Sequence, residues 1–315
     1  MAITKPADMN FSDKNIIMII SGTPGVGKTT LALSAPDVLL IDTDNGMCRV
    51  KAEHRKDASI CATFQEVRAD IEAAKASGKY KTIVIDTGGA LIEYMKAYIL
   101  SNAELYPGAG KKAGGMAIAG YGYIKQLFMD FSADLRKNFN VIYLFHEEKK
   151  RDDDVTTYEI VCEGSTKTLV YQPADLAAHM AIINGKRTLG FSPTESYFGK
   201  AAYGIKGVMT IPELADGDDN NFLTKLFAQV RENLSKETAS LDGKTKAYEA
   251  AMTELKAEIE KVTDAPTATA CFNFVKNYKH ALTSKTEATA LLNEKVKSLK
   301  LKFNTKTQEF YNAEG

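Results

Sequence analysis

Four short runs of consecutive apolar residues mark the first half of the chain, and segments with helical periodicity separate them. The runs cover residues 16–20, 38–41, 83–85, which follow Thr82, and 141–145. Continuous apolar strands predict a parallel sheet covered on both faces, since a solvated face would carry alternating polar residues. Thr63 and Glu66 form a capping box before a helix that Gly78 ends, and further helices are expected around residues 91–100 and 124–135. This alternation predicts an α/β fold.

The pattern changes after residue 146. Residues 180–183 and 188–191 flank the dipeptide Asn184-Gly185, which predicts a tight hairpin and hence antiparallel additions to the sheet. Residues 212–221 are acidic and rich in turn formers, and apolar residues recur at helical spacing from residue 222 onward. We therefore expect two domains, an α/β core over residues 1–215 and an α-helical region over residues 216–315.

The segment after the first apolar run carries the most specific motif in the chain. It reads G-T-P-G-V-G-K-T and matches the phosphate loop G-x-x-x-x-G-K-[ST], followed by a short helix that Pro36 stops. Glycines let successive backbone N–H groups surround a phosphate, and the following helix offers its positive end. The residues predicted to bind nucleotide are Gly22, Thr23, Pro24, Gly25, Val26, Gly27, Lys28, Thr29 and Thr30.

Two side chains of this loop have predicted chemical roles. Lys28 is expected to bridge the β- and γ-phosphates, and the Thr29 hydroxyl to hold Mg²⁺. The sequence therefore predicts ATP and Mg²⁺ as cofactors.

Polar residues end the other predicted strands, at the edge of the sheet where open α/β folds bind ligands. Asp86 is expected to bind Mg²⁺ together with Thr29, the alternative being a helix N-cap. Asp44 or Asp42 is expected to orient or deprotonate the attacking water, although either could instead form an Asx-turn. His146 is the candidate sensor of the γ-phosphate, the alternative being an ordinary histidine at a strand end.

Composition restricts the partners. Forty Lys and Arg residues balance forty Asp and Glu residues, so any nucleic-acid surface must be local. The four cysteines are far apart and form no C-x-x-C pair, which fits a reducing cytosol and disfavours a metal site. The sequence shows neither a leader pattern nor an apolar run long enough to cross a bilayer, so we expect a cytoplasmic protein with no membrane partner.

The order of these motifs resembles the RecA-like ATPase core, and more narrowly the phage ATP-binding proteins of the RecA-core single-strand annealing and recombination group. Residues 21–30, 39–44, 80–87 and 140–147 carry the resemblance, which extends over residues 14–210. It implies a RecA-like P-loop NTPase core, a ring or filament of copies of this chain, and single-stranded DNA as partner. It further implies the host cytoplasm as location and a single-strand DNA-binding protein as a possible partner. RecA-like proteins usually carry glutamate where this chain has Asp44.

The resemblance also implies DNA contacts in the loops after the third and fourth strands. In residues 106–123, lysines would bind phosphates and aromatic rings would stack under bases; the alternative is a solvated loop. In residues 148–172, an acidic run at residues 152–154 follows the basic residues and favours an interprotomer surface instead. The candidate DNA-binding residues are Lys111, Lys112, Tyr121, Tyr123, Lys149, Lys150 and Arg151.

A cation from a neighbouring protomer is expected to reach the γ-phosphate in such assemblies. The resemblance places Lys200 there, with Lys206 and Arg187 as rivals. From Lys276 onward, eight lysines oppose four glutamates, which indicates a helical arm that contacts DNA or a partner, or simply a solvated face.

Two function classes stay open. The favoured one is a Mg²⁺-dependent ATPase, slow or DNA-stimulated, that binds single-stranded DNA as an oligomer and promotes annealing or strand pairing in phage recombination. The alternative is a nucleotide-dependent switch or scaffold that acts on a protein partner, such as a helicase loader or regulator, without binding DNA. A small-molecule kinase is a weaker third class, because the sequence shows no arginine-rich lid.

Overall fold

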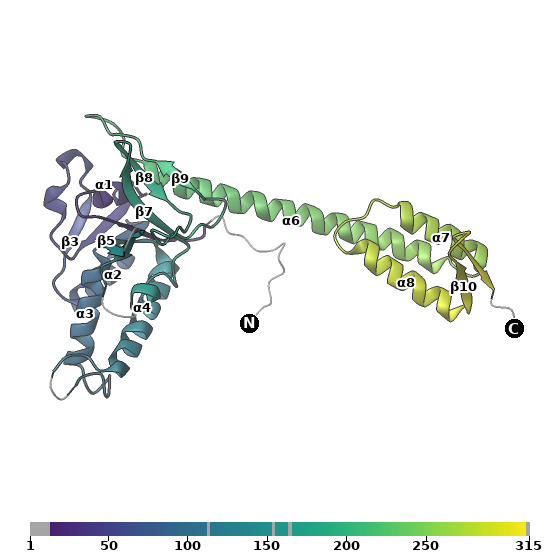
Figure 1. Ribbon diagram of the computed structural model, residues 1–315, viewed down its shortest axis with the longest axis horizontal. Coiled ribbons are helices and arrows are strands. Elements are labelled where there is room, and N and C mark those ends of the chain that lie inside the picture. Colours follow the sequence, from purple (N-terminus) through teal and green to yellow (C-terminus); the bar gives the residue numbers. More distant parts are fainter. Residues whose placement is uncertain (1–12, 112–113, 153–154, 163–165, 313–315) are drawn as a thin grey trace. The chain divides into compact units, whose positions relative to one another are not determined.

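The computed structural model describes residues 13–111, 114–152, 155–162 and 166–312 (Figure 1). The chain divides into two compact units, of which one is Asp13–Asn233 and the other begins at Leu234. This division lies within a helix that starts at Phe222, whose first turns pack on the α/β unit: Leu223, for example, is fully buried. The domain boundary predicted after residue 215 is a statement about which segments fold independently, and it stays a prediction.

A large sheet forms the centre of the α/β unit, with nine strands in the part of the chain that the structure describes. Its order is β3-β2-β4-β5-β1-β7-β8-β9, and β6 pairs with β5. All pairings from β3 to β7 are parallel, whereas β6, β8 and β9 are antiparallel to their neighbours. The strands are β1 (Ile17–Gly22), β2 (Val38–Asp42), β3 (Asp57–Ile60), β4 (Thr82–Asp86), β5 (Asn140–Asp152), β6 (Val155–Ile160), β7 (Leu176–Ile183), β8 (Lys186–Gly190) and β9 (Val208–Thr210).

The predicted fold class is therefore confirmed: a mostly parallel sheet with antiparallel additions. The hairpin predicted at Asn184-Gly185 joins β7 to β8, and both turn residues have positive φ, as a two-residue hairpin turn of this type requires. One strand prediction was wrong and one strand was missed. Strand β5 continues past His146 to Asp152, because its polar end pairs with β6. Strand β3 was missed because its four residues are mostly exposed and only two of them are apolar.

Helices α2 (Phe64–Ser77), α3 (Gly88–Ser101) and α4 (Ile118–Asn138) share one core with the sheet, and α3 and α4 lie side by side (Figure 1). The capping box before α2 is confirmed, since the Thr63 side chain accepts a hydrogen bond from the Glu66 N–H and Gly78 ends the helix. Short helices are α1 (Lys28–Ala32), α5 (Thr166–Leu169) and the 3-10 turns η2 (Met47–Arg49) and η3 (Ala52–His54).

The second unit is mainly helical, as predicted. It contains the later part of α6 (Phe222–Glu260), then α7 (Ala265–Asn277) and α8 (Ser284–Ser298). Its end was not predicted: β10 (Leu301–Asn304) and β11 (Glu309–Asn312) form an antiparallel hairpin. The rings of Phe303 and Phe310 lie 4.9 Å apart and pack against the helical core. No helix within the described residues is both long and apolar enough to cross a membrane.

The register of the sheet decides where the candidate residues meet. Gly22, the first residue of the phosphate loop, pairs with His146, and Asp42 pairs with Asp86 on the neighbouring strand. Strands β2, β4, β5 and β1 are parallel neighbours, so their polar carboxyl ends share one edge.

Candidate active site

The phosphate loop links β1 to α1, and its glycines are required by geometry. A Cβ on Gly22 would lie 2.5 Å from the Met180 carbonyl oxygen, so only glycine fits between β1 and β7. Gly27 has a φ of 107°, in the left-handed region that side chains disfavour, and this conformation turns the chain into α1. The loop therefore has the backbone shape that a phosphate cradle needs.

Lys28 lies over the hollow of this loop. Its side chain is buried, and its Nζ donates hydrogen bonds to the carbonyl oxygens of Gly22 at 2.8 Å and Thr23 at 3.1 Å. Burial lowers the pKa of Lys28, while the charge of Asp86 acts in the opposite direction. Because the donors of an ammonium can turn to a stronger acceptor, phosphate oxygens can replace these backbone carbonyls.

Thr29 and Asp86 meet at the next position. The Thr29 hydroxyl donates to Asp86 Oδ2 at 2.6 Å. Asp86 is buried, and burial raises the pKa of its carboxyl to about 6, with the charges of Asp44 and Asp42 acting in the same direction and the Thr29 hydrogen bond against it. A hydroxyl and a carboxylate side by side are oxygen ligands of the kind Mg²⁺ prefers, so these residues fit the ion.

The alternative reading of Asp86 as a helix cap is wrong. Thr87 takes that position, since its side chain accepts a hydrogen bond from the Ala90 N–H at the start of α3. The Asp86 carboxylate therefore stays directed at the phosphate loop.

The structure separates the two aspartates that follow β2. Asp42 is fully buried, and its carboxylate accepts hydrogen bonds from the backbone N–H groups of Gly46 at 2.8 Å and Met47 at 2.9 Å. It therefore holds the loop, as the Asx-turn alternative proposed. Asp44 is partly exposed and forms an ion pair with Arg49 at 3.1 Å. The role of Asp44 toward the attacking water stays a prediction.

His146 connects Lys28 to Asp44. Its Nδ1 lies 3.3 Å from Lys28 Nζ, and its Nε2 lies 3.8 Å from Asp44 Oδ2. Because the lysine ammonium can only donate, Nδ1 acts as acceptor and the ring proton belongs on Nε2, facing Asp44. Burial, together with the charge of Lys28, lowers the pKa of His146, so the ring is neutral at pH 7.

Lys200 does not lie at this site in its own chain. Its backbone pairs with Ala177, its Nζ donates to the Ala174 carbonyl oxygen, and Ala177 pairs with Ile19 rather than with the phosphate loop. Its action on a neighbouring protomer stays a prediction. The rival Arg187, on β8, reaches the loop within the same chain, where its Nε donates to the Val26 carbonyl oxygen at 2.9 Å.

A buried contact between a carboxylate and an imidazole beside the loop was missed. Glu147 Oε2 lies 2.8 Å from His179 Nδ1, and only 2% and 8% of the two side chains are exposed. The His179 ring stacks on Tyr197 with centroids 4.4 Å apart, and His179 pairs with Ser21 just before the loop. The sequence did contain a signal for this contact: Glu147 is a charged residue directly after His146, at the end of an apolar run. The pair holds β5 and β7 on either side of β1.

The first candidate DNA loop is shorter than expected. Tyr121 and Tyr123 belong to α4 and pack against the core, and the rings of Tyr106 and Tyr123 lie 5.3 Å apart. These rings therefore already serve the packing of the tip of α3 and α4. Lys111 is exposed, whereas Lys112 lies outside the described residues.

The second candidate segment is a hairpin, β5–β6, rather than a loop. Lys149, Lys150 and Arg151 all lie on β5. Lys150 Nζ lies 2.8 Å from Glu159 Oε2, and this bond and one from Lys167 lower the pKa of Glu159 to about 2. Part of the positive charge of the hairpin is therefore compensated within the chain.

Fold and site together define a P-loop NTPase: a phosphate loop after β1, and a hydroxyl beside a carboxylate, a pair that fits Mg²⁺, at the same sheet edge. Residues 14–203 match the family described as AAA domain, which covers more than half of the chain. The chain belongs to this family of AAA-type P-loop ATPases. None of the curated proteins compared with the chain matches it.

Proposed function

We propose that the protein binds and hydrolyses ATP with Mg²⁺ at the edge formed by β1, β2, β4 and β5. The observation that carries this proposal is the contact of 2.6 Å between Thr29 and Asp86, directly beside the buried ammonium of Lys28. Lys28 binds the β- and γ-phosphates, and Thr29 and Asp86 hold the ion. When bound, Mg²⁺ offsets negative charge on the phosphates.

Asp44 orients the attacking water in this proposal. Its carboxylate faces His146 Nε2 at 3.8 Å, and His146 Nδ1 faces Lys28. A γ-phosphate that draws Lys28 away from His146 leaves Nδ1 without its donor, and the ring can then reorient toward Asp44 or the phosphate. One imidazole thus links the presence of the γ-phosphate to the water-orienting residue and to β5. Aspartate is shorter than the glutamate usual in RecA-like proteins, so we expect slow turnover.

We further propose that the protein is a phage recombination protein of the RecA-like group. In this proposal it assembles as an oligomer on single-stranded DNA. The support is the order of motifs along residues 14–210 and the exposed Lys111 at the tip of α3 and α4. Hydrolysis would release the strand after annealing or pairing. A single-strand DNA-binding protein is a further partner under this proposal.

A second function is favoured by the compensated charges. Lys150 is paired with Glu159, Tyr121 and Tyr123 are packed, and the chain has no net charge. These features suit a nucleotide-dependent switch that acts on a protein partner and never binds DNA.

The ATPase rate with and without a homopolymer single strand separates the two functions. Stimulation by DNA that weakens with added salt supports the recombination protein, because phosphate contacts release counterions. A rate that stays the same with DNA at low salt contradicts it and supports the switch.

A further inference from the structure

The terminal hairpin β10–β11 packs on helix α7 with one face only (Figure 1). Phe303 and Phe310 are a cross-strand pair on that face, and their ring centroids lie 4.9 and 6.2 Å from the centroid of the Phe272 ring on α7. The Phe310 N–H also donates a hydrogen bond to Thr269 Oγ1 at 2.8 Å. Because neighbouring residues of a strand point to opposite faces, the other face of the hairpin is exposed to solvent.

Lys302 and Tyr311 lie on the exposed face. They are directly opposite each other in the register, so their side chains project from the same face at neighbouring positions. Both side chains are exposed, and the exposed fraction of Tyr311 is 46%. An exposed aromatic ring next to an ammonium suits a single nucleic-acid strand, because the ring can stack on an unpaired base while the ammonium binds the adjoining phosphate.

Three further lysines lie at the hairpin. Lys276, on α7, donates from its Nζ to Gln308 Oε1 at 2.8 Å in the turn between the strands, and Lys306 belongs to the same turn. Lys300 directly precedes β10. Glu309 is the only acidic residue between residues 299 and 312, so positive charge dominates here. We name the following residues the hairpin surface: Lys276, Lys300, Lys302, Lys306 and Tyr311.

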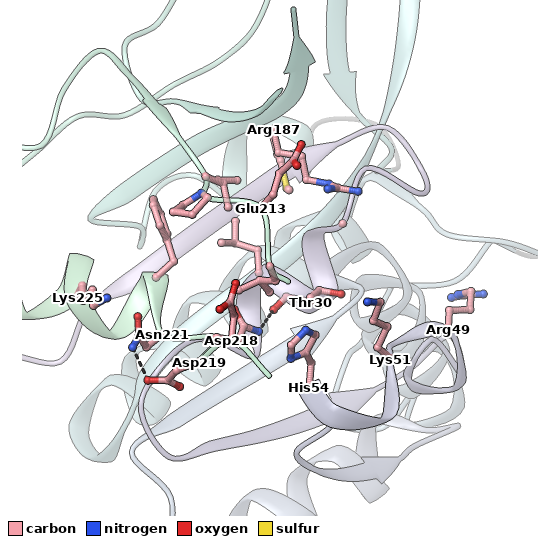
Figure 2. A pocket seen from close by; sticks show the side chains of 18 residues that line it. Thr30, Arg49, Lys51, His54, Arg187, Glu213, Asp218, Asp219, Asn221 and Lys225 are labelled. Atoms are coloured by element: carbon pink, nitrogen blue, oxygen red, sulfur yellow. Dashed lines mark hydrogen bonds between the residues drawn. The ribbon is translucent and has the colours of Figure 1, made fainter. Parts of the chain in front are cut away.

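Carboxylates do not compensate the charge of these lysines. Eight lysines lie between residues 276 and 306, and among the described residues none of them forms an ion pair. In the α/β unit, by contrast, Lys81 pairs with Asp37 at 3.0 Å, and the cations labelled in Figure 2, around a cavity beside the phosphate loop, share its walls with carboxylates such as Glu213 and Asp218. Lysines without a carboxylate partner are those whose charge a phosphate can neutralise, with release of its counterion.

Resting on the proposed function, in which single-stranded DNA is the partner, we propose that the hairpin surface binds this strand. Tyr311 stacks on one base, and the lysines bind the adjoining phosphates. A duplex has the same phosphates but no open base face, so the surface prefers a single strand.

The hairpin surface is separate from the nucleotide site. It belongs to the second unit, outside residues 14–203 that match the AAA domain family, and it shares no residue with the phosphate loop. Its occupation therefore requires neither nucleotide nor Mg²⁺. A strand bound there stays attached to the chain in each nucleotide state, whereas DNA contacts of the α/β unit can change with hydrolysis.

Fluorescence of a tryptophan on the hairpin surface reports the stacking directly. Tyr311→Trp gives the chain its single tryptophan, since the sequence contains none. We expect a homopolymer strand of about ten nucleotides to quench this fluorescence without nucleotide, added salt to reverse the quenching, and a blunt duplex of the same length to quench much less. Phe274→Trp is the matched control: Phe274 is 38% exposed and lies two residues after Phe272, on the opposite side of α7, so its indole should stay unquenched.

Anisotropy of a labelled strand gives a second readout, the affinity. Tyr311→Ala should weaken binding by about fivefold or more, because one base loses its stacking partner. Replacing Lys302 and Lys306 with alanine should lower the slope of log affinity against log salt by about 1.4, the value for two phosphate contacts of a single strand. Replacing Lys246 and Lys285, exposed lysines on α6 and at the start of α8, removes the same charge and should leave the slope unchanged.

The outcomes separate this inference from the proposed function. If the chain binds the strand but Tyr311→Trp shows no quenching, or if strand and duplex quench it equally, the inference is overturned and the DNA partner of the proposed function is left in place. A wild type that binds no strand at low salt overturns both. Quenching without any stimulation of ATP turnover by DNA supports the hairpin surface and contradicts the recombination function alone.

Discussion

Replacing Asp86 with asparagine should stabilise the nucleotide-free protein while removing its response to Mg²⁺. The carboxyl is 4% exposed and lies near two other carboxylates, and burial raises its pKa from 3.8 to about 6. Asparagine keeps the shape and the acceptor for Thr29 but carries no charge. The variant therefore separates the cost of the buried charge from its use as a metal ligand.

The sign of the effect follows from proton binding. Between pH 4 and pH 6 the folded protein holds a proton on Asp86 that the unfolded chain has released, so stability falls as the pH rises through this range. Above the pKa of Asp86 in the folded protein, the carboxylate is charged in both the folded and the unfolded state, and stability falls no further. A pKa shift from 3.8 to about 6 lowers the free energy of unfolding of the wild type by about 3 kcal/mol at pH 7. At pH 4 this loss shrinks to below about 1 kcal/mol.

The assay is thermal unfolding of wild type and Asp86→Asn at several pH values, without nucleotide or metal. For a unit of this size we expect the variant to melt up to about 10 °C higher at pH 7 and nearly together with the wild type at pH 4. Mg²⁺ should add to the rise in melting temperature that ATP gives the wild type, and should add nothing in the variant. A variant that is less stable than the wild type at pH 7, or a difference that does not depend on pH, refutes the reasoning.

Three further changes test other parts of the structure. Glu147→Ala removes the buried carboxylate that faces His179 and should lower the free energy of unfolding by about 1–3 kcal/mol in a urea titration. Glu148→Ala, at an exposed neighbour, should cost below about 1 kcal/mol, and equal losses would contradict the assignment. Gly27→Ala, at a φ of 107°, should weaken ATP binding in calorimetry without lowering the amount of folded protein, and unaltered affinity would count against the loop geometry. Replacing Lys111 and Lys112 with alanine should lower the slope of log affinity against log salt by roughly two for single-stranded DNA; an unchanged slope excludes this loop.

The parts of the site that the sequence predicted depend on signals close together in the chain. The phosphate loop is one continuous motif, and Asp86 and His146 each follow an apolar run whose direction in a parallel sheet is known. The register of β1, β4 and β5 then had to bring these ends to one edge. The residue pattern alone left Asp42 and Asp44 open, and only the resemblance favoured Asp44, because the distinction depends on which carboxylate the following backbone amides reach.

The parts that were missed depend on partners distant in sequence. Glu147 and His179 are both recognisable as unusual residues in strands, but only the strand order β5-β1-β7 makes them a pair. Arg187 contacts the phosphate loop because β8 follows β7 in the sheet, and Lys200, at the position that the resemblance favoured, lies elsewhere in its own chain. The terminal hairpin was missed because its strands have four residues each and a polar turn without glycine.

ATP turnover with Mg²⁺ by the wild type and by Lys28→Ala tests the central claim most directly. Lys81→Ala, at an exposed lysine paired with Asp37, is the matched control. The account predicts phosphate release by the wild type and the control, and at least a hundredfold slower release by Lys28→Ala, of the order found when a group that stabilises the transition state is removed. Equal turnover by Lys28→Ala and the wild type would contradict it.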